Sequence, residues 1–271
     1  FSIFNPRTNE YSDKGQQHRM EFPVMQWLFA AVYKLLGTDK IIVTRLLTFL
    51  MGIGTVFGMF YLTRNFFRDV GIAAIAAWCF NFSPVFYYYT INPMPDNMAL
   101  CCGVWSIALF RGYLNSGKLA HVVLSSVFFC LAVLAKLPFI IYGVVIFSYL
   151  LVMLIRKERS VRQLTGVGLI YLAGVLIALS WYATVIPHWV IGAVHGVFDQ
   201  SQNHPDLAYV IQRTIIAILP ELIINYGSVL FFLIGFYFIF SLKLFRKVQV
   251  LPFTFLGLSL LAYFTYEMNI I

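Results

Sequence analysis

The chain has 271 residues, of which 61% are hydrophobic and only 11% are charged, and its mean hydropathy is +0.82. Soluble domains contain about 45–50% apolar and about 25% charged residues, so this composition excludes an ordinary soluble protein and indicates an integral membrane protein. The net charge of +8 would suit a nucleic-acid-binding protein. However, the basic residues gather in short loops between apolar segments, which argues against a nucleic-acid partner.

Apolar segments follow one another along most of the chain. A helix that spans a bilayer needs about 20 mostly apolar residues, with a range of roughly 17–25. Allowing for short ones, the predicted spans are 41–63, 71–89, 98–112, 120–136, 137–155, 164–186, 228–242 and 250–266. Pro138 separates the fourth span from the fifth, because proline cannot donate the hydrogen bond that continues a helix. The sequence therefore predicts an all-α, polytopic bundle of transmembrane helices with membrane lipid around it.

Two further segments are amphipathic. Glu21 to Leu36 and Tyr209 to Asn225 have apolar residues at helical spacing, which predicts interfacial juxtamembrane helices; short re-entrant segments are the alternative. We therefore divide the chain into an extracytoplasmic first loop with its helix, 1–40, and a transmembrane domain, 41–271, with an outward loop and interfacial helix at 187–227. The start at Phe1 and the end just past an apolar run predict truncation at both ends.

Small residues inside the spans have a packing explanation. Gly54 and Gly58 have the GxxxG spacing that lets helices approach closely. The cysteines all lie in apolar runs, where we expect small buried hydrophobic side chains instead of disulfides or metal ligands; they are Cys79, Cys101, Cys102 and Cys130.

The charges divide the loops into two sets. If the spans alternate in direction, one set contains most of the Lys and Arg residues and only Asp69 and Glu158 as acids. Basic loops stay in the cytoplasm. The opposite set is longer and contains nearly all the acids and most of the histidines: His18, His188, His195 and His204. This pattern predicts that the working face is extracytoplasmic.

Charged residues at the outward edge of the predicted spans are the candidates for chemistry. Lys136 lies between two apolar runs, where ionisable groups often mark substrate sites, although snorkelling to the interface is an alternative. Asp96 opens the span at 98 and Glu21 opens the first amphipathic helix; an N-cap and a helix-dipole contact are their structural alternatives. A lysine can hold phosphate, and a carboxylate can act as a base or a metal ligand. Together the three suit a substrate with a lipid tail and a phosphate.

Several short motifs, in order, resemble the membrane-embedded GT-C glycosyltransferases of family 39, the protein O-mannosyltransferase and aminoarabinose transferase type. They are Ile3-Phe4-Asn5-Pro6-Arg7, Glu21-Phe22-Pro23, Gly37, Arg45-Leu46, Ser83-Pro84, Pro95-Asp96, Ala135-Lys136-Leu137-Pro138 and Ser180-Trp181-Tyr182. The resemblance covers nearly the whole chain and implies a GT-C-like fold. It implies transfer of a sugar from a polyprenyl-phosphate carrier to a glycan, lipid or protein acceptor. The expected location is the bacterial inner membrane, with an extracytoplasmic active site.

The resemblance also implies roles for individual residues. Asp96 and Glu21 would be catalytic, and Lys136 would bind substrate at the carrier phosphate. Arg19 and Tyr88 are expected to bind substrate as well.

A divalent metal ion is the one cofactor that the resemblance implies. Glu21 would bind it together with a histidine from a later outward loop, for which we choose His204 over His188 and His195.

The chain departs from the family pattern at its start. In the family, the principal catalytic Asp follows the first transmembrane helix, whereas here the only acids before Glu21 are Glu10 and Asp13. We therefore expect that helix and that Asp to be missing from this chain. A transporter or lipid flippase is an alternative, although the charges lie at the edges of spans and no internal repeat is evident. A non-catalytic membrane subunit is a further alternative.

Overall fold

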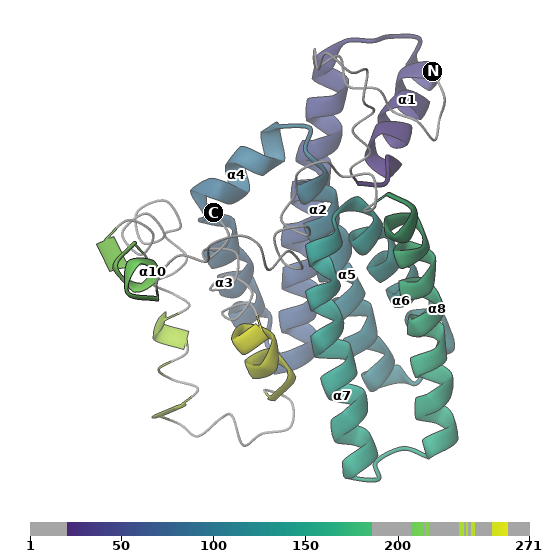
Figure 1. Ribbon diagram of the computed structural model, residues 1–271, viewed down its shortest axis with the longest axis vertical. Coiled ribbons are helices and arrows are strands. Elements are labelled where there is room, and N and C mark those ends of the chain that lie inside the picture. Colours follow the sequence, from purple (N-terminus) through teal and green to yellow (C-terminus); the bar gives the residue numbers. More distant parts are fainter. Residues whose placement is uncertain are drawn as a thin grey trace.

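The computed structural model describes residues 21–185 and, toward the C-terminus, residues 207–213, 215–216, 233–235, 237, 240–241 and 251–259. Within these residues the regular secondary structure is helical, with no strand, which confirms the all-α prediction. Figure 1 shows the long helices running side by side in an elongated bundle, with α1 at one end. The elements are α1 (Val24–Leu36), α2 (Ile41–Phe67), α3 (Val70–Asn81), α4 (Pro84–Ile91), α5 (Pro95–Ser116), α6 (Leu119–Ala135), the 3-10 helix η1 (Leu137–Tyr142), α7 (Gly143–Ile155), α8 (Val161–Val185) and α10 (Leu207–Arg213).

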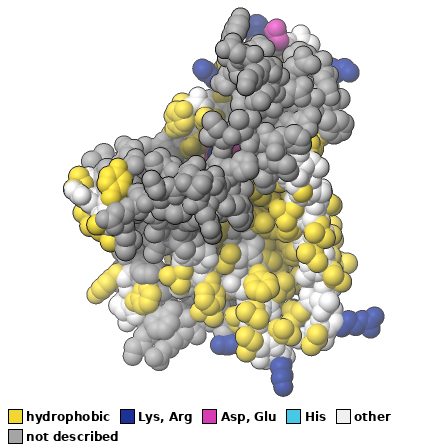
Figure 2. Space-filling model, viewed as in Figure 1, with side chains coloured by type: hydrophobic (Ala, Val, Ile, Leu, Met, Phe, Trp, Pro, Cys, Tyr) yellow, Lys and Arg dark blue, Asp and Glu magenta, His cyan; other side chains and the backbone are white. Residues whose placement is uncertain are grey.

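Among the described residues, four helical segments are long and apolar enough to cross a membrane: α2, α5, η1 continued by α7, and α8. Figure 2 shows hydrophobic side chains spread over the side of the bundle and Lys and Arg side chains toward its ends. This distribution is what a bilayer requires of the surface that faces it. The chain is an integral membrane protein, as its composition predicted.

The span predicted at 71–89 is wrong as a single helix. α3 ends at Asn81, and α4 starts at Pro84, because proline fits the first turn of a helix but not its interior. Ser83 marks the start, since its hydroxyl accepts a hydrogen bond from the backbone N–H of Phe86 at 3.5 Å. The chain thus turns between two short helices at this point.

Several predictions concern residues outside the described ones. This group comprises residues 1–20, the outward loop at 187–206 and most of the span at 228–242. Residues 251–259 are helical within the span predicted at 250–266, and α10 covers the start of the second amphipathic segment. The boundaries at 40 and 41 between the first loop and the transmembrane domain stay predictions.

α5 is the central helix of the described bundle. In its most apolar stretch 67% of the residues are buried, against 28–33% in the other three candidate spans. Gly54 and Gly58 pack α2 against it: the Trp105 indole N–H donates to the Gly54 carbonyl at 2.9 Å, and a Cβ on Gly58 would lie 2.9 Å from Val104. The close-packing role predicted for this GxxxG pair is confirmed.

Polar side chains also join the core helices. The Ser125 hydroxyl of α6 donates to the Ser106 carbonyl of α5 and pairs with the Tyr171 hydroxyl of α8. Such bonds between helices satisfy polar groups that lipid cannot. All four cysteines are free thiols; Cys102 is buried as predicted, whereas the other three are only partly buried.

Candidate functional site

Asp96 and Lys136 form an ion pair where α5 begins and α6 ends. Pro95 and Asp96 lie in the first turn of α5, and Lys136 lies in extended backbone, φ −158° and ψ 119°, between α6 and η1. The Lys136 ammonium donates to the Asp96 carboxylate, and the two side chains are 32% and 21% exposed. Asp96 is not the N-cap, because that position belongs to Met94. The pair brings together two of the predicted site residues, and it remains accessible to a ligand.

The backbone carbonyl of Leu134, two residues before Lys136, accepts hydrogen bonds from two other segments of the chain. In a regular helix it would accept from the N–H of residue 138, but Pro138 has no N–H. It accepts instead from the Phe22 backbone N–H at 3.2 Å and from the Tyr182 hydroxyl at 3.0 Å. Pro138 therefore frees the acceptor that attaches both the segment before α1 and the end of α8 to the Lys136 turn.

Glu21 lies in this segment. α1 starts at Val24, with Pro23 at the N-cap position and no acidic residue in the first turn, so Glu21 lies two residues before the N-cap. Phe22 packs edge-on against Trp27 and Trp181, with ring centroids 4.8 Å apart in both pairs. The Glu21 carboxylate lies within electrostatic range of the Tyr182 hydroxyl.

α1 lies directly against the helix ends that carry the ion pair. Its buried residues Met25 and Phe29 form one cluster with Met98, Ala99, Cys102, Ala132 and Ala135. Two of these follow Asp96 closely in the chain, and Ala135 precedes Lys136. The predicted apolar face of α1 is only partly covered, since Leu35 is 83% and Leu36 58% exposed. Glu21, Asp96 and Lys136 thus belong to the same end of the bundle.

Asn97, next to Asp96, is a positioning residue that the sequence analysis missed. Its side chain is fully buried, and its Nδ2 donates to the Thr48 carbonyl of α2 at 2.6 Å. Its Oδ1 has no hydrogen-bond partner among the described residues. Burying an amide costs free energy unless the amide is hydrogen-bonded, and the bond to Thr48 also fixes the start of α5 against α2. The sequence indicated the importance of Asn97 only through its position directly after Pro95-Asp96.

Trp181 and Tyr182 are also functional candidates that the sequence analysis did not choose. Both appear in a motif of the resemblance, but only the structure brings them to Phe22 and Leu134. The Trp181 indole N–H is buried without an acceptor among the described residues. The signal for Tyr182 was indirect: Pro138 requires a new donor for the carbonyl of residue 134.

Of the remaining predicted site residues only Tyr88 is among the described ones, and it has no contact with the ion pair. Tyr88 is on α4, 54% exposed, with its ring packed edge-on against Tyr89. Arg19 and His204 lie outside the described residues. In the described part of the chain no three His, Cys, Asp or Glu side chains are close enough together to hold a metal ion. Glu21 is therefore the only predicted metal ligand whose position is known.

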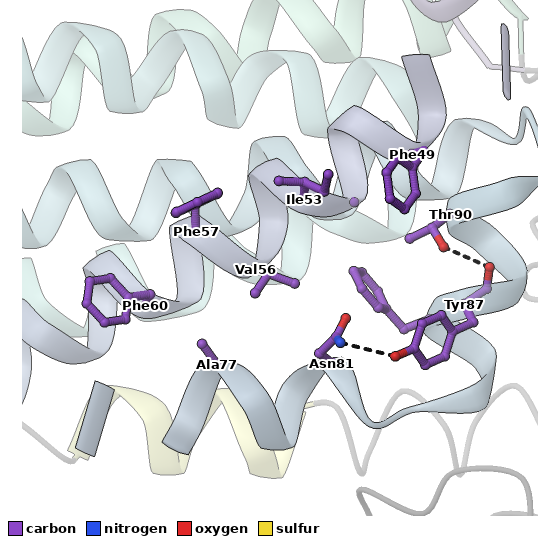
Figure 3. A pocket seen from close by; sticks show the side chains of 11 residues that line it. Phe49, Ile53, Val56, Phe57, Phe60, Ala77, Asn81, Tyr87 and Thr90 are labelled. Carbon is purple, nitrogen blue, oxygen red and sulfur yellow. Dashed lines mark hydrogen bonds between the residues drawn. The ribbon is translucent and has the colours of Figure 1, made fainter. Parts of the chain in front are cut away.

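An apolar groove of about 450 Å³ lies between α2, α3 and α4 (Figure 3). Phe49, Ile53, Phe57 and Phe60 line its α2 side, and the Asn81 amide donates to the Tyr87 hydroxyl at 3.1 Å on the opposite side. Phe49 follows Thr48, whose carbonyl accepts from Asn97. The groove therefore starts close to the helix end that carries Asp96, and it can hold a flexible apolar chain.

A family model described as dolichyl-phosphate-mannose-protein mannosyltransferase matches residues 20–191. The match spans more than half of the chain and includes Glu21, Asp96, Lys136 and Tyr182. No curated protein and no solved structure gave a significant match. The resemblance to family 39 GT-C enzymes is thereby confirmed: the chain belongs to the dolichyl-phosphate-mannose-protein mannosyltransferase family and is a membrane glycosyltransferase.

Proposed function

We propose that this protein transfers a glycosyl group from a polyprenyl-phosphate sugar to an acceptor on the extracytoplasmic face of the membrane. The observation that carries the proposal is the accessible Asp96–Lys136 ion pair, at the same end of the bundle as Glu21. An ammonium and a carboxylate at one membrane edge match the two charges that the reaction creates. These are the negative charge of the departing phosphate and the proton of the attacking hydroxyl.

In the proposed step, the acceptor oxygen attacks C1 of the sugar and loses its proton to a carboxylate. The bond between C1 and the phosphate oxygen breaks, and the lipid phosphate leaves with the electron pair. Asp96 is the proposed base. Lys136 is the proposed partner of the leaving phosphate, whose charge a preorganised cation stabilises. In the protein without substrate, Asp96 and Lys136 neutralise each other, so binding of the phosphate would release the carboxylate for its role as base.

Glu21, Arg19, Tyr88 and His204 have secondary roles in the proposal. Glu21 is the proposed second catalytic carboxylate and, with His204, the ligand of a divalent ion, which would supply positive charge near the phosphate. Arg19 is next but one to Glu21 in the chain, so we keep it as a substrate-binding residue. We keep Tyr88 as a more distant contact, because it is exposed on α4.

The lipid part of the donor has a suitable place. The groove lined by Phe49, Ile53 and Phe57 is apolar and starts next to the Thr48–Asn97 contact. We propose that the polyprenyl chain lies there with its phosphate toward Lys136. The acceptor is proposed to be a glycan, lipid or protein hydroxyl, and the membrane the bacterial inner membrane.

A transfer assay tests the proposal. The full-length protein in nanodiscs is given radiolabelled polyprenyl-phosphate sugars, and release of sugar from the lipid is followed in wild type, Asp96→Asn and Lys136→Gln. Lys40→Gln is the matched control, since Lys40 is exposed just before α2 and has no role in the pair. We expect both site variants to lose transfer while remaining folded. Undiminished transfer in both would refute the assignment, and no release of sugar from any donor by folded wild type would favour a transporter or a non-catalytic subunit.

A further inference from the structure

The other end of the bundle contains a cavity lined by cationic and amide side chains. It measures about 320 Å³ and is lined by Tyr61, Arg64, Asn65 and Arg68 of the end of α2 and by Asn115 of the end of α5. α2 and α5 run parallel, because Thr48 meets Asn97 at one end while the Arg111 guanidinium lies 5.4 Å from the Phe66 ring at the other. The cavity is therefore at the opposite end from the Asp96–Lys136 pair and takes no part in the proposed reaction.

The cations around this cavity have no counter-charge among the described residues. Within the described residues Arg64 and Arg68 form no ion pair, and no carboxylate lines the cavity. The nearest acid in the chain, Asp69, accepts instead from the Ile72 backbone N–H at 2.8 Å and so caps α3. Asn65 lines the cavity, but its Nδ2 is buried from it and has no partner among the described residues. Two guanidinium groups at one cavity without a counter-charge are the complement of an anion.

The backbone at Arg68 gives a second indication. Its φ is +58°, a left-handed conformation that costs little only in glycine. At the ends of α1 and α5 the same conformation is taken by Gly37 and Gly117. At the ends of α2 and α7 the chain has Arg68 and Lys157 instead. Both positions keep a cation at a conformational cost, and the Arg68 side chain lines the cavity.

The surroundings favour a lipid as the source of the anion. α2 is a candidate membrane span, so its end lies where the chain leaves the hydrocarbon. Phe67 and Val70, which flank Arg68 and Asp69, are 56% and 59% exposed, as expected of side chains beside acyl chains. The volume is at the small end of the ligand-site range, about 300–1,000 Å³, and suits a headgroup more than a whole metabolite.

We propose that Arg64 and Arg68 bind the phosphate of an anionic phospholipid in the leaflet at this end of the bundle, with Asn115 next to the rest of the headgroup. The basic loops alone would attract such lipids diffusely. The cavity adds a fixed position, with two guanidinium groups for the phosphate oxygens. This site is independent of the proposed transfer reaction.

Native mass spectrometry of the purified full chain with phosphatidylglycerol or phosphatidylcholine tests the proposal. We expect phosphatidylglycerol to remain bound preferentially, and Arg64→Gln with Arg68→Gln to weaken its apparent affinity about tenfold. Arg162→Gln is the control, because Arg162 is an exposed cation in the first turn of α8 at the same end. It should change the affinity less than about twofold. An equal loss in the control, or none in the double variant, would overturn the site.

Two further measurements test simpler explanations of lipid binding. Inorganic phosphate should not displace phosphatidylglycerol; if it does, the cavity is a site for free phosphate and the lipid assignment fails. Arg68→Gly keeps the left-handed turn and removes the cation, so it should unfold no more easily than wild type while losing lipid preference. Retained preference in this variant would contradict a role for the Arg68 side chain.

Discussion

The two ends of the bundle treat charge in opposite ways. At one end Lys136 is neutralised by Asp96, and α1 lies against the helix ends that carry the two residues. At the other end Arg64 and Arg68 face a cavity with no carboxylate in its lining. An ion pair within the chain gives a site that is neutral until a substrate separates it. Cations without partners give a site that is ready for an anion at all times. The contrast shows that the role of a basic residue at a helix end can be inferred only once its acidic partner, or the lack of one, is known.

The largest effect should come from exchanging the paired charges. The double variant Asp96→Lys with Lys136→Asp again has one lysine and one aspartate in the pair, at exchanged positions. We expect transfer to stay at least about 10²-fold below wild type, as for loss of a catalytic electrostatic group. Thermal unfolding should recover most of what either single change loses. Recovered transfer would mean that the pair only holds α5 to the Lys136 turn.

The next prediction compares removal of a paired and an unpaired charge. Asp96→Asn leaves a partly buried ammonium without its partner, and we expect a loss of about 1–3 kcal/mol in the free energy of unfolding. Arg68→Gln should change it by no more than about 0.5 kcal/mol, because it breaks no pair. Unfolding in mixed detergent gives both values under one condition. Equal losses would remove the distinction between the two ends.

Pro138→Ala should weaken the attachment of α1. The new N–H at residue 138 competes for the Leu134 carbonyl, which then accepts less well from Phe22 and Tyr182. Loss of one hydrogen bond corresponds to about 1 kcal/mol, or roughly fivefold faster amide exchange in the segment before α1. Hydrogen-exchange mass spectrometry measures this rate, with the peptide of α5 as the internal reference. An unchanged rate would show that packing of Met25 and Phe29 alone holds α1.

The smallest effect is expected at Arg68. Arg68→Gly removes the conformational strain of a left-handed residue with a side chain, but it raises the conformational entropy of the unfolded chain. We expect the free energy of unfolding to increase by about 0.5 kcal/mol on balance. The same change at Lys157, the other non-glycine residue with positive φ, gives an independent measure of the backbone term. Destabilisation at Arg68 but not at Lys157 would mean that the Arg68 side chain has a structural partner.

Much of the fold could be predicted from the sequence, because lipid restricts a chain to helices whose length and apolarity are readable. The spans near 41–63, 98–112 and 164–186 correspond to longer helices, α2, α5 and α8. They were predicted too short because polar residues such as Asn65 and Asn97 lie inside them. The span at 71–89 failed because the apolar run continues through Ser83-Pro84 while the helix does not.

The candidate site could be predicted only in part. Asp96, Lys136 and Glu21 were identifiable as charges at span edges. Their grouping depends on contacts between segments far apart in the chain, such as that of Phe22 with Leu134. Asn97 and Tyr182 look like ordinary helix residues. Pro138 indicates that the Leu134 carbonyl needs another donor, but only the packing shows that Tyr182 is that donor and that Asn97 is buried against Thr48.

The shared Leu134 carbonyl has a consequence for how the protein is made. The chain emerges from the ribosome N-terminus first, so Phe22 is synthesised long before the carbonyl to which it binds. Until α6 has been inserted and interrupted at Pro138, the segment before α1 has no acceptor to bind. The second donor, Tyr182, arrives only with the end of α8. The segment before α1 therefore waits for its acceptor on α6, and the three segments that meet at Leu134 come together only after the end of α8 has been made.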